Sequence, residues 1–90
     1  MPRRASVVGA GVVVLQPGGI MEWHSTDVRE ELLIPLKGWA RVEIQSSRSV
    51  RRQLRLGDGQ CLLLPKHTMH RVVNVSTKAS RYLYITAPAK

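Results

Sequence analysis

The stretch LLLPKHTMHRVVN, residues 62–74, constrains the fold more than any other part of the chain. It passes from an apolar segment through a proline turn to two histidines, His67 and His70, and then alternates up to Asn74. Side chains at positions i and i+2 of a strand lie on the same face, so His70, Val72 and Asn74 are expected to share one. The stretch therefore predicts a strand that carries a histidine directly after a tight turn.

Similar runs recur along the chain at intervals of about 8 to 12 residues, separated by clusters of Gly, Pro, Ser and Asp. The predicted strands are residues 7–16, 20–24, 30–36, 39–45, 50–56, 60–64, 69–75 and 81–86. Alternation is clearest in residues 39–45, where Ala40, Val42 and Ile44 are expected to lie on one face. Helical periodicity is nearly absent. The sequence thus predicts an all-β fold, a small jelly roll or β-barrel of about eight strands.

Length and composition indicate one domain, residues 1–90, without a membrane-spanning segment. The first apolar run is predicted to be a strand and not a signal peptide, because it lacks a small-x-small cleavage site. Cys61 is the single cysteine, so there is no intramolecular disulfide, and a cytoplasmic location is expected. Cys61 itself is predicted to lie in the core, since no neighbouring positive charge or helix terminus would activate it as a nucleophile.

The net charge is +8, from 14 Lys and Arg against 6 Asp and Glu. The densest group of charges is Arg48, Arg51, Arg52 and Arg55. An excess of this size favours a small anionic ligand held by arginine side chains, although the solvated face of a strand explains the pattern equally well. Nucleic acid is disfavoured as a partner because no binding motif is visible and aromatic residues make up only 4% of the chain.

Residues 31–34 and 61–64 are apolar on both faces of their predicted strands. An exposed hydrophobic strand would aggregate, so both runs are expected to be covered on both sides. A chain of 90 residues also buries a modest core and gains from association. A homodimer is therefore predicted.

Two further residues could join His70 in a polar site. His24 is expected to share a face with Glu22 and Thr26 if its strand continues that far. Glu31 opens a strand on an apolar face, which is an unusual place for a carboxylate, because an unpaired buried charge costs several kcal/mol. Two imidazoles and a carboxylate aimed into one cavity could bind a metal ion. Each histidine taken alone could instead be a packing residue that hydrogen-bonds a backbone carbonyl.

Together these residues resemble the two motifs of the cupin superfamily. The first motif, G-x5-H-x-H-x(3,4)-E-x6-G, spans residues 18–38, and the matching residues are Gly18, His24, Glu31 and Gly38. The second, G-x5-P-x-G-x2-H-x3-N, spans residues 59–74, and the matching residues are Gly59, Pro65, His70 and Asn74. The chain is thus similar to a small single-domain cupin of the bacterial type, and the motifs cover most of it.

The chain departs from these motifs at two positions. Thr26 stands where the first motif has its second histidine, and His67 stands where the second motif has a glycine. The resemblance implies that His24, Glu31 and His70 bind a divalent ion of iron, manganese, nickel or zinc, with water or substrate completing the coordination. His67 could replace the missing imidazole if the turn redirects it, although positions i and i+3 face opposite ways in a regular strand.

By resemblance, the function is that of a metal-dependent enzyme, similar to a dioxygenase or an isomerase, which acts on a small molecule inside the barrel. The alternative is a non-catalytic module that binds or senses a small ligand, with or without a metal. Asn74 is expected to be a turn and strand-end residue rather than a catalytic one. The aromatic side chains are expected to be packing residues; they are Trp23, Trp39, Tyr82 and Tyr84.

Overall fold

The computed structural model describes residues 8–45 and 51–89, which form eight strands. The strands are β1 (Gly9–Leu15), β2 (Ile20–Ser25), β3 (Arg29–Lys37), β4 (Ala40–Gln45), β5 (Arg51–Leu56), β6 (Leu62–Leu64), β7 (Met69–Val73) and β8 (Ser80–Pro88). Each predicted run overlaps one strand, so the eight-strand prediction is confirmed; Val7, Arg48 and Val50 lie outside the described residues. Within the described ranges there is no helix at all, and hence no helix that could span a membrane.

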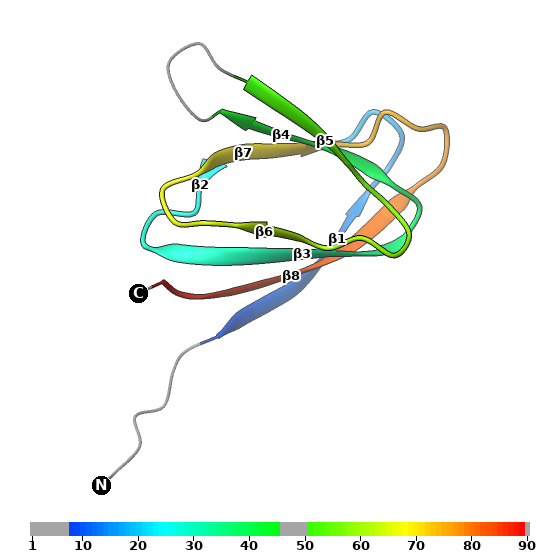
Figure 1. Cartoon of the computed structure of the whole chain (residues 1–90). Coiled ribbons are helices and arrows are strands. Elements are labelled where there is room, and N and C mark those ends of the chain that lie inside the picture. Colours follow the sequence, from blue (N-terminus) through cyan, green and yellow to red (C-terminus); the bar gives the residue numbers. More distant parts are fainter. Residues whose placement is uncertain (1–7, 46–50, 90) are drawn as a thin grey trace, which may run out of the picture.

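The strands form two antiparallel sheets stacked face to face (Figure 1). Sheet I has the order β1-β8-β3-β6 and is the lower layer in the view, and sheet II has the order β2-β7-β4-β5 and is the upper layer. Strands that follow one another along the chain mostly alternate between the layers, as in a jelly roll. The all-β prediction is therefore confirmed.

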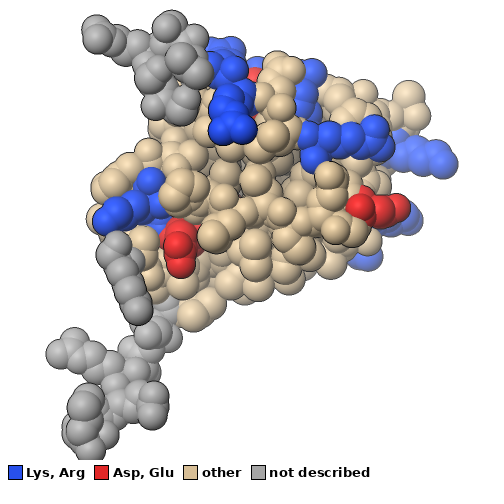
Figure 2. Space-filling view, viewed as in Figure 1, with Lys and Arg blue, Asp and Glu red and all other residues tan. Residues whose placement is uncertain are grey.

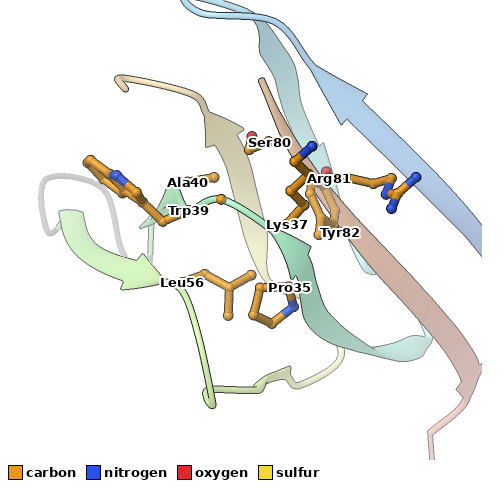
Figure 3. A pocket seen from close by; sticks show the side chains of 9 residues that line it. Pro35, Lys37, Trp39, Ala40, Leu56, Ser80, Arg81 and Tyr82 are labelled. Carbon is orange, nitrogen blue, oxygen red and sulfur yellow. The ribbon is translucent and has the colours of Figure 1, made fainter. Parts of the chain in front are cut away.

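The core lies between the two sheets, where alternate residues of each strand meet. Leu33 of sheet I and Val42 of sheet II are completely buried. Ala40 and Val42 are buried and Ile44 packs against them, as their alternation predicts. At the end of the sandwich near the β3–β4 turn, side chains such as Pro35 and Leu56 close the interior and leave no space for a water molecule (Figure 3). A cavity lies beside Glu31, at the other end of β3.

Cys61 is exposed, and the prediction that it lies in the core is wrong. The strand that was expected to begin at Gln60 begins at Leu62 and is three residues long. Cys61 therefore belongs to the segment that follows the Gly59 turn, where no sheet pairing holds it against the core.

The outward face of sheet II is covered by arginines around one buried carboxylate, Glu43, of which 2% is exposed. Arg41 Nε lies 3.0 Å from Glu43 Oε2, and Arg71 Nε lies 2.9 Å from Glu43 Oε1. The Arg71 guanidinium also lies 5.1 Å from the centre of the Trp23 ring, and Arg55 lies 4.3 Å from that of Trp39. Figure 2 shows several Lys and Arg side chains over the upper part of the molecule, where this sheet lies, and others at its two ends.

Glu43 is expected to stabilise the fold in a pH-dependent way. Burial opposes its ionisation, but hydrogen bonds and positive charge from Arg71 and Arg41 outweigh burial and lower its pKa. A carboxyl group whose pKa is lower in the folded state than in the unfolded state stabilises the fold at pH values above the unfolded-state pKa. This stabilisation is lost as the pH falls through the folded-state pKa. We expect Glu43→Gln to lower the free energy of unfolding by about 2 kcal/mol at neutral pH, since both arginines remain partly solvated.

Urea denaturation at a series of pH values would measure this contribution. The difference in free energy of unfolding between wild type and Glu43→Gln should shrink as the pH falls below 4.5, the ordinary pKa of the Glu43 carboxyl group. Glu22→Gln, which alters an exposed carboxylate on the same sheet, is the control and should change little. A difference between Glu43→Gln and wild type that is the same at pH 7 and pH 3 would contradict the assignment.

Candidate metal centre

The structure brings His24, Glu31 and His70 together in the interior, from three different strands. His24 of β2 pairs directly with His70 of β7 in sheet II, and Glu31 of β3 faces them from sheet I. Between Met21 and His24 the register shifts by one residue, which is a β-bulge. Because of this extra residue, His24 and Met21 both line the interior cavity although they are three positions apart.

The bulge also overturns a prediction from regular alternation. Glu22 was expected to share a face with His24, but its side chain is exposed. A regular strand would have placed both on one side, whereas the extra residue reverses the parity between them.

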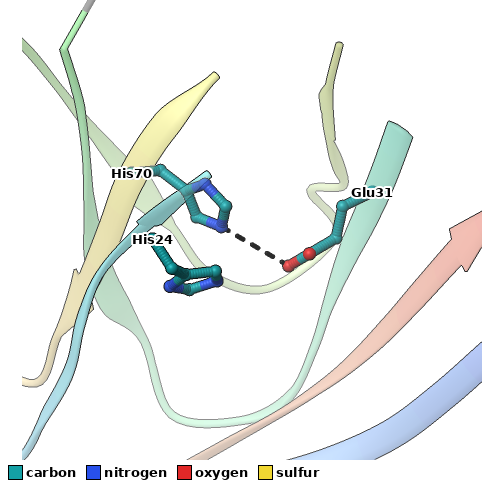
Figure 4. A group of neighbouring side chains, drawn as sticks. All are labelled: His24, Glu31 and His70. Atoms are coloured by element: carbon teal, nitrogen blue, oxygen red, sulfur yellow. Dashed lines mark ion pairs between the residues drawn. The ribbon is translucent and has the colours of Figure 1, made fainter. Parts of the chain in front are cut away.

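The three side chains are close enough to share one ion (Figure 4). Each offers a ligand atom, and these atoms lie within 4.8 Å of one another. His70 Nε2 lies 3.6 Å from Glu31 Oε2, and the side chains of His70 and Glu31 are 0% and 12% exposed. The rings of His24 and His70 are 4.1 Å apart between centroids and tilted by 58°. The cluster is thus compact; His70 is buried, and His24 and Glu31 are half-buried.

Backbone carbonyls fix the orientation of both imidazoles. His24 Nδ1 lies 2.7 Å from the carbonyl oxygen of Glu22, and His70 Nδ1 lies 3.1 Å from that of Thr68. A carbonyl can only accept, so each Nδ1 carries the proton and donates it. In the neutral form of each ring, Nε2 then carries the lone pair, which is the arrangement that metal-binding histidines adopt.

The surroundings of the His70 Nε2 atom test whether the cluster fits a cation. It is buried and has no hydrogen-bond partner, and buried polar atoms of proteins are rarely left so. Its distance of 3.6 Å to the Glu31 carboxylate is too long for a hydrogen bond. Two atoms bound at about 2.1 Å to one ion at the tetrahedral angle lie about 3.4 Å apart. The residues present therefore fit a metal ion.

A cavity of about 290 Å³ opens beside the cluster. Its lining residues are Val13, Met21, His24, Glu31, Tyr82 and Tyr84. Burial, together with the nearby Glu31 and Tyr84 side chains, raises the pKa of Tyr82, so this phenol keeps its proton near neutral pH. Gly11 makes room for Tyr84, because a Cβ atom at Gly11 would lie 2.6 Å from the Tyr84 hydroxyl oxygen.

The two tyrosines are packing residues, as the sequence predicts, because Tyr82 belongs to the core and Tyr84 packs against it; both also line the cavity. They lie two positions apart on β8, and this i, i+2 spacing already places them on one face. The tryptophans, in contrast, contact arginines over the outward face of sheet II. Both tyrosines line the cavity, and a tyrosine hydroxyl can donate to an oxygen-bearing ligand.

Thr26 holds two turns together. Its hydroxyl donates to the carbonyl of Pro65 at 2.7 Å and accepts from the N–H of Thr68 at 3.0 Å, and the residue is 6% exposed. Thr68 in turn supplies the carbonyl that orients His70. The residue at the position of the missing family histidine therefore supports the cluster indirectly.

His67 is exposed, and the structure does not bring it into the cluster. Its φ is +58°, and its N–H donates to the carbonyl oxygen of Asp27 at 2.8 Å. A positive φ favours glycine, which explains the glycine that the motif has at this position. The turn therefore directs the imidazole outward, along the rim of a second cavity of about 380 Å³ that Arg52 also lines. Within the described residues, neither Lys nor Arg lines the cavity beside the cluster.

Fold and cluster together define a two-sheet β domain with two imidazoles and one carboxylate converging in its interior. The model of one protein family, described as the cupin domain, matches residues 11–86. The chain belongs to this family.

Solved structures share this fold at low sequence identity. A Bacillus halodurans protein aligns over 92% of this chain and 64% of its own, with a TM-score of 0.82 and 19% identity. An oxalate oxidase aligns over 90% of this chain and 42% of its own, with a TM-score of 0.82 and 21% identity. Drosophila melanogaster CENP-C bound to CAL1 aligns over 83% of this chain and 61% of its own, with a TM-score of 0.78 and 17% identity.

These similarities concern the fold alone. The chain spans between 42% and 64% of the length of these three proteins. A search of curated protein sequences finds no match.

Proposed function

We propose that the chain is a cupin that binds one divalent metal ion through His24, Glu31 and His70 and accepts a small oxygen-bearing ligand in the adjoining cavity. The observation that carries the proposal is the buried, unpartnered Nε2 of His70, 3.6 Å from the Glu31 carboxylate. Iron, manganese, nickel and zinc are all compatible with this donor set. A set of two imidazoles and one carboxylate is typical of iron sites.

The chain's own groups have clear tasks in such a site. The carbonyls of Glu22 and Thr68 orient the imidazoles, and the hydroxyls of Tyr82 and Tyr84 can donate hydrogen bonds to the ligand. A bound ion would supply a Lewis acid that polarises an oxygen atom of the ligand. The packed far end of the sandwich limits the entry of water from that side. Dioxygenase-like or isomerase-like chemistry would suit this arrangement, and oxalate oxidase is an enzyme with the same fold.

A non-catalytic ligand-binding module is the second candidate. It is favoured by Thr26, whose hydroxyl is committed to two backbone groups where the family motif has a ligand histidine. CENP-C bound to CAL1 shows that a protein with this fold can take a protein partner. Turnover of a bound small molecule would support the enzyme, and reversible binding without turnover would support the module.

Four further assignments complete the proposal. We place the whole chain, residues 1–90, in one domain and in the cytoplasm, where the exposed thiol of Cys61 would stay reduced. We also propose that the chain acts as a homodimer. The anionic ligand that the net charge suggests fits the Arg52 side of the interior better than the cavity beside the cluster, since no cation lines the latter among the described residues.

Metal analysis of untagged protein tests the site. We expect about one ion per chain in the wild type, and less than about a tenth of that in His24→Ala and Glu31→Gln, because two remaining ligands rarely hold a divalent ion. His67→Gly is the matched control: it removes an imidazole from the same region, suits the positive φ, and should keep its metal. Circular dichroism would verify that each variant is folded.

Two outcomes would count against the proposal. The first is wild-type protein that stays free of all four ions after incubation with each. The second is a full metal complement in both ligand variants. The first result would leave the non-catalytic, metal-free module as the better reading.

A further inference from the structure

The second cavity, of about 380 Å³, lies between the edge strands of the two sheets, β5 of sheet II and β6 of sheet I (Figure 1). It shares no lining residue with the cavity beside the cluster. Sites for small molecules commonly begin at about 300 Å³, so this space can hold a ligand of its own. We call it the edge cavity; the lining residues that bear on its chemistry are Ile44, Arg52, Leu54, Leu62, Leu64 and His67.

The walls of the edge cavity are mostly apolar. Ile44 of β4 and Leu54 of β5 line it from sheet II, and Leu62 and Leu64 of β6 line it from sheet I. Leu64 is buried, and the other three side chains are half-buried. Walls of this kind bind by removing apolar surface from water, so they fit a ligand with a hydrocarbon body.

Arg52 brings a positive charge to the inward face of β5. It pairs directly with Ile44, which packs against the core. Residues directly opposite one another on paired strands share a face of the sheet, so Arg52 faces inward. Arg51 and Arg55 alternate to the outward face, where each contacts a tryptophan ring. Arg52 thus differs from both neighbouring arginines, because it lines a cavity.

His67 lines the edge cavity from the turn before β7. Its φ of +58° is a conformation that glycine adopts at lower cost than any residue with a side chain. Residues that are kept in such a conformation despite the cost occur most often at functional sites. An imidazole N–H can donate a hydrogen bond to an anion in the cavity, which gives this histidine a role that glycine could not fill.

The charge of the lining specifies the kind of anion. In the part of the chain that the structure describes, no Asp or Glu lines the edge cavity, and Arg52 is the one lining residue with a fixed positive charge. A carboxylate carries a single negative charge and accepts two parallel hydrogen bonds from a guanidinium. A dianion such as a phosphate ester would leave a charge unpaired beside the leucines, which is costly.

We infer that the edge cavity binds a small monocarboxylate with a hydrocarbon body. Arg52 and His67 hold the carboxylate, and the leucines and Ile44 surround the body. The inference rests on the anionic ligand of the proposed function and specifies its chemistry and its place. It requires no metal ion, because the ligands of the cluster line the other cavity or lie outside both.

Isothermal titration calorimetry of the full chain with octanoate tests the inference. The protein is first treated with a chelator, so that the carboxylate has no metal ion to bind. We expect octanoate to bind with a dissociation constant below about 1 mM. Acetate keeps the charge without the hydrocarbon body, and octanol keeps the body without the charge. Each should bind at least about tenfold more weakly than octanoate.

Two variants test the residues that hold the carboxylate. Arg52→Gln should raise the dissociation constant of octanoate about tenfold, and His67→Gly about fivefold, because each loses a hydrogen bond to the anion. Both should fold, since Arg52 and His67 are exposed and glycine suits the positive φ. Arg55→Gln is the matched control: it removes the same charge from the outward face of the same strand and should bind like the wild type.

An inward-facing charge on an edge strand can also serve only to prevent pairing with another sheet. In that case Arg52→Gln would bind octanoate as tightly as the wild type, and the inference would be overturned. It would also be overturned by a wild type that does not bind octanoate at about 1 mM, or by equal losses of affinity in Arg52→Gln and Arg55→Gln.

Glu31→Gln separates this result from the proposed metal site. The variant should lose its metal ion and still bind octanoate like the chelator-treated wild type, because Glu31 lines the other cavity. A large change in octanoate affinity would place the ligand beside the cluster and refute the inference. Octanoate binding by a wild type that takes up no metal ion would support the inference and contradict the metal site alone.

Discussion

Metal-free wild-type protein is expected to gain about 4 kcal/mol in free energy of unfolding when its divalent ion is added at about a thousand times the dissociation constant. Glu31→Gln is expected to gain almost nothing under the same conditions. The reason is linkage: an ion that binds the folded chain alone stabilises it, and the folded chain alone holds these ligands together. Glutamine preserves the size of the side chain and removes the charge that the cation needs.

Urea denaturation of chelator-treated protein, with and without each of the four candidate ions, measures this gain. His67→Gly is again the control and should gain as much as the wild type, because its imidazole lies outside the cluster. An equal gain in Glu31→Gln would show that the ion binds elsewhere. When the four ions are compared at the same free concentration, the ion that gives the largest gain in free energy of unfolding is the preferred metal, which the donor set leaves open among four candidates.

The eight strands could be predicted because their signal is local. Alternating apolar residues such as Ala40, Val42 and Ile44 fix which side of a strand is buried before any partner strand is known. The convergence of His24 and His70 could be predicted only through the spacing of the family motifs. The motif spacing reflects the pairing of β2 with β7, two strands that are far apart in the sequence. No pattern of residues within either strand reveals this pairing.

The errors arose where the backbone departs from regular geometry. The bulge before His24 turned Glu22 outward, and a single sequence carries no sign of an extra residue in a ladder. The positive φ of His67 directed its imidazole away from the cluster. The family motif has glycine at the position of His67, and glycine at a tight turn often indicates a left-handed backbone. This glycine could have predicted the positive φ of His67. Cys61 was misplaced because the strand boundary fell two residues later than predicted.

Replacement of Asn74 is expected to cost a large share of the stability of the fold. It is completely buried, its Nδ2 donates to the carbonyls of Leu15 at 2.9 Å and Lys78 at 2.8 Å, and its Oδ1 accepts from the N–H of Ser76 at 2.9 Å. We expect Asn74→Asp to lower the free energy of unfolding by about 4 kcal/mol at neutral pH, because a carboxylate cannot donate and would face two carbonyl oxygens. Urea denaturation would measure the loss.

Two comparisons separate this hydrogen bonding from a simple packing defect. Asn74→Asp should recover part of its stability as the pH falls toward about 4, because protonation restores one donor. Ser76→Ala, which removes a hydroxyl 2.7 Å from Asn74 Oδ1, should cost only about 1 kcal/mol, since both donated bonds remain. A loss in Asn74→Asp that is independent of pH would contradict the expected role of the amide.

The consequence for the site follows from the position of Asn74 directly after β7. The strand that carries His70 ends at Val73, and the Asn74 amide then ties it to Leu15 at the end of β1 and to the loop before β8. His70 and Asn74 are four residues apart on one face, so loosening this anchor should let β7 shift against β2. A destabilised but folded Asn74 variant should therefore bind its ion more weakly than the wild type. If its affinity were unchanged, the pairing of β7 with β2 and β4 would be sufficient to place the histidine.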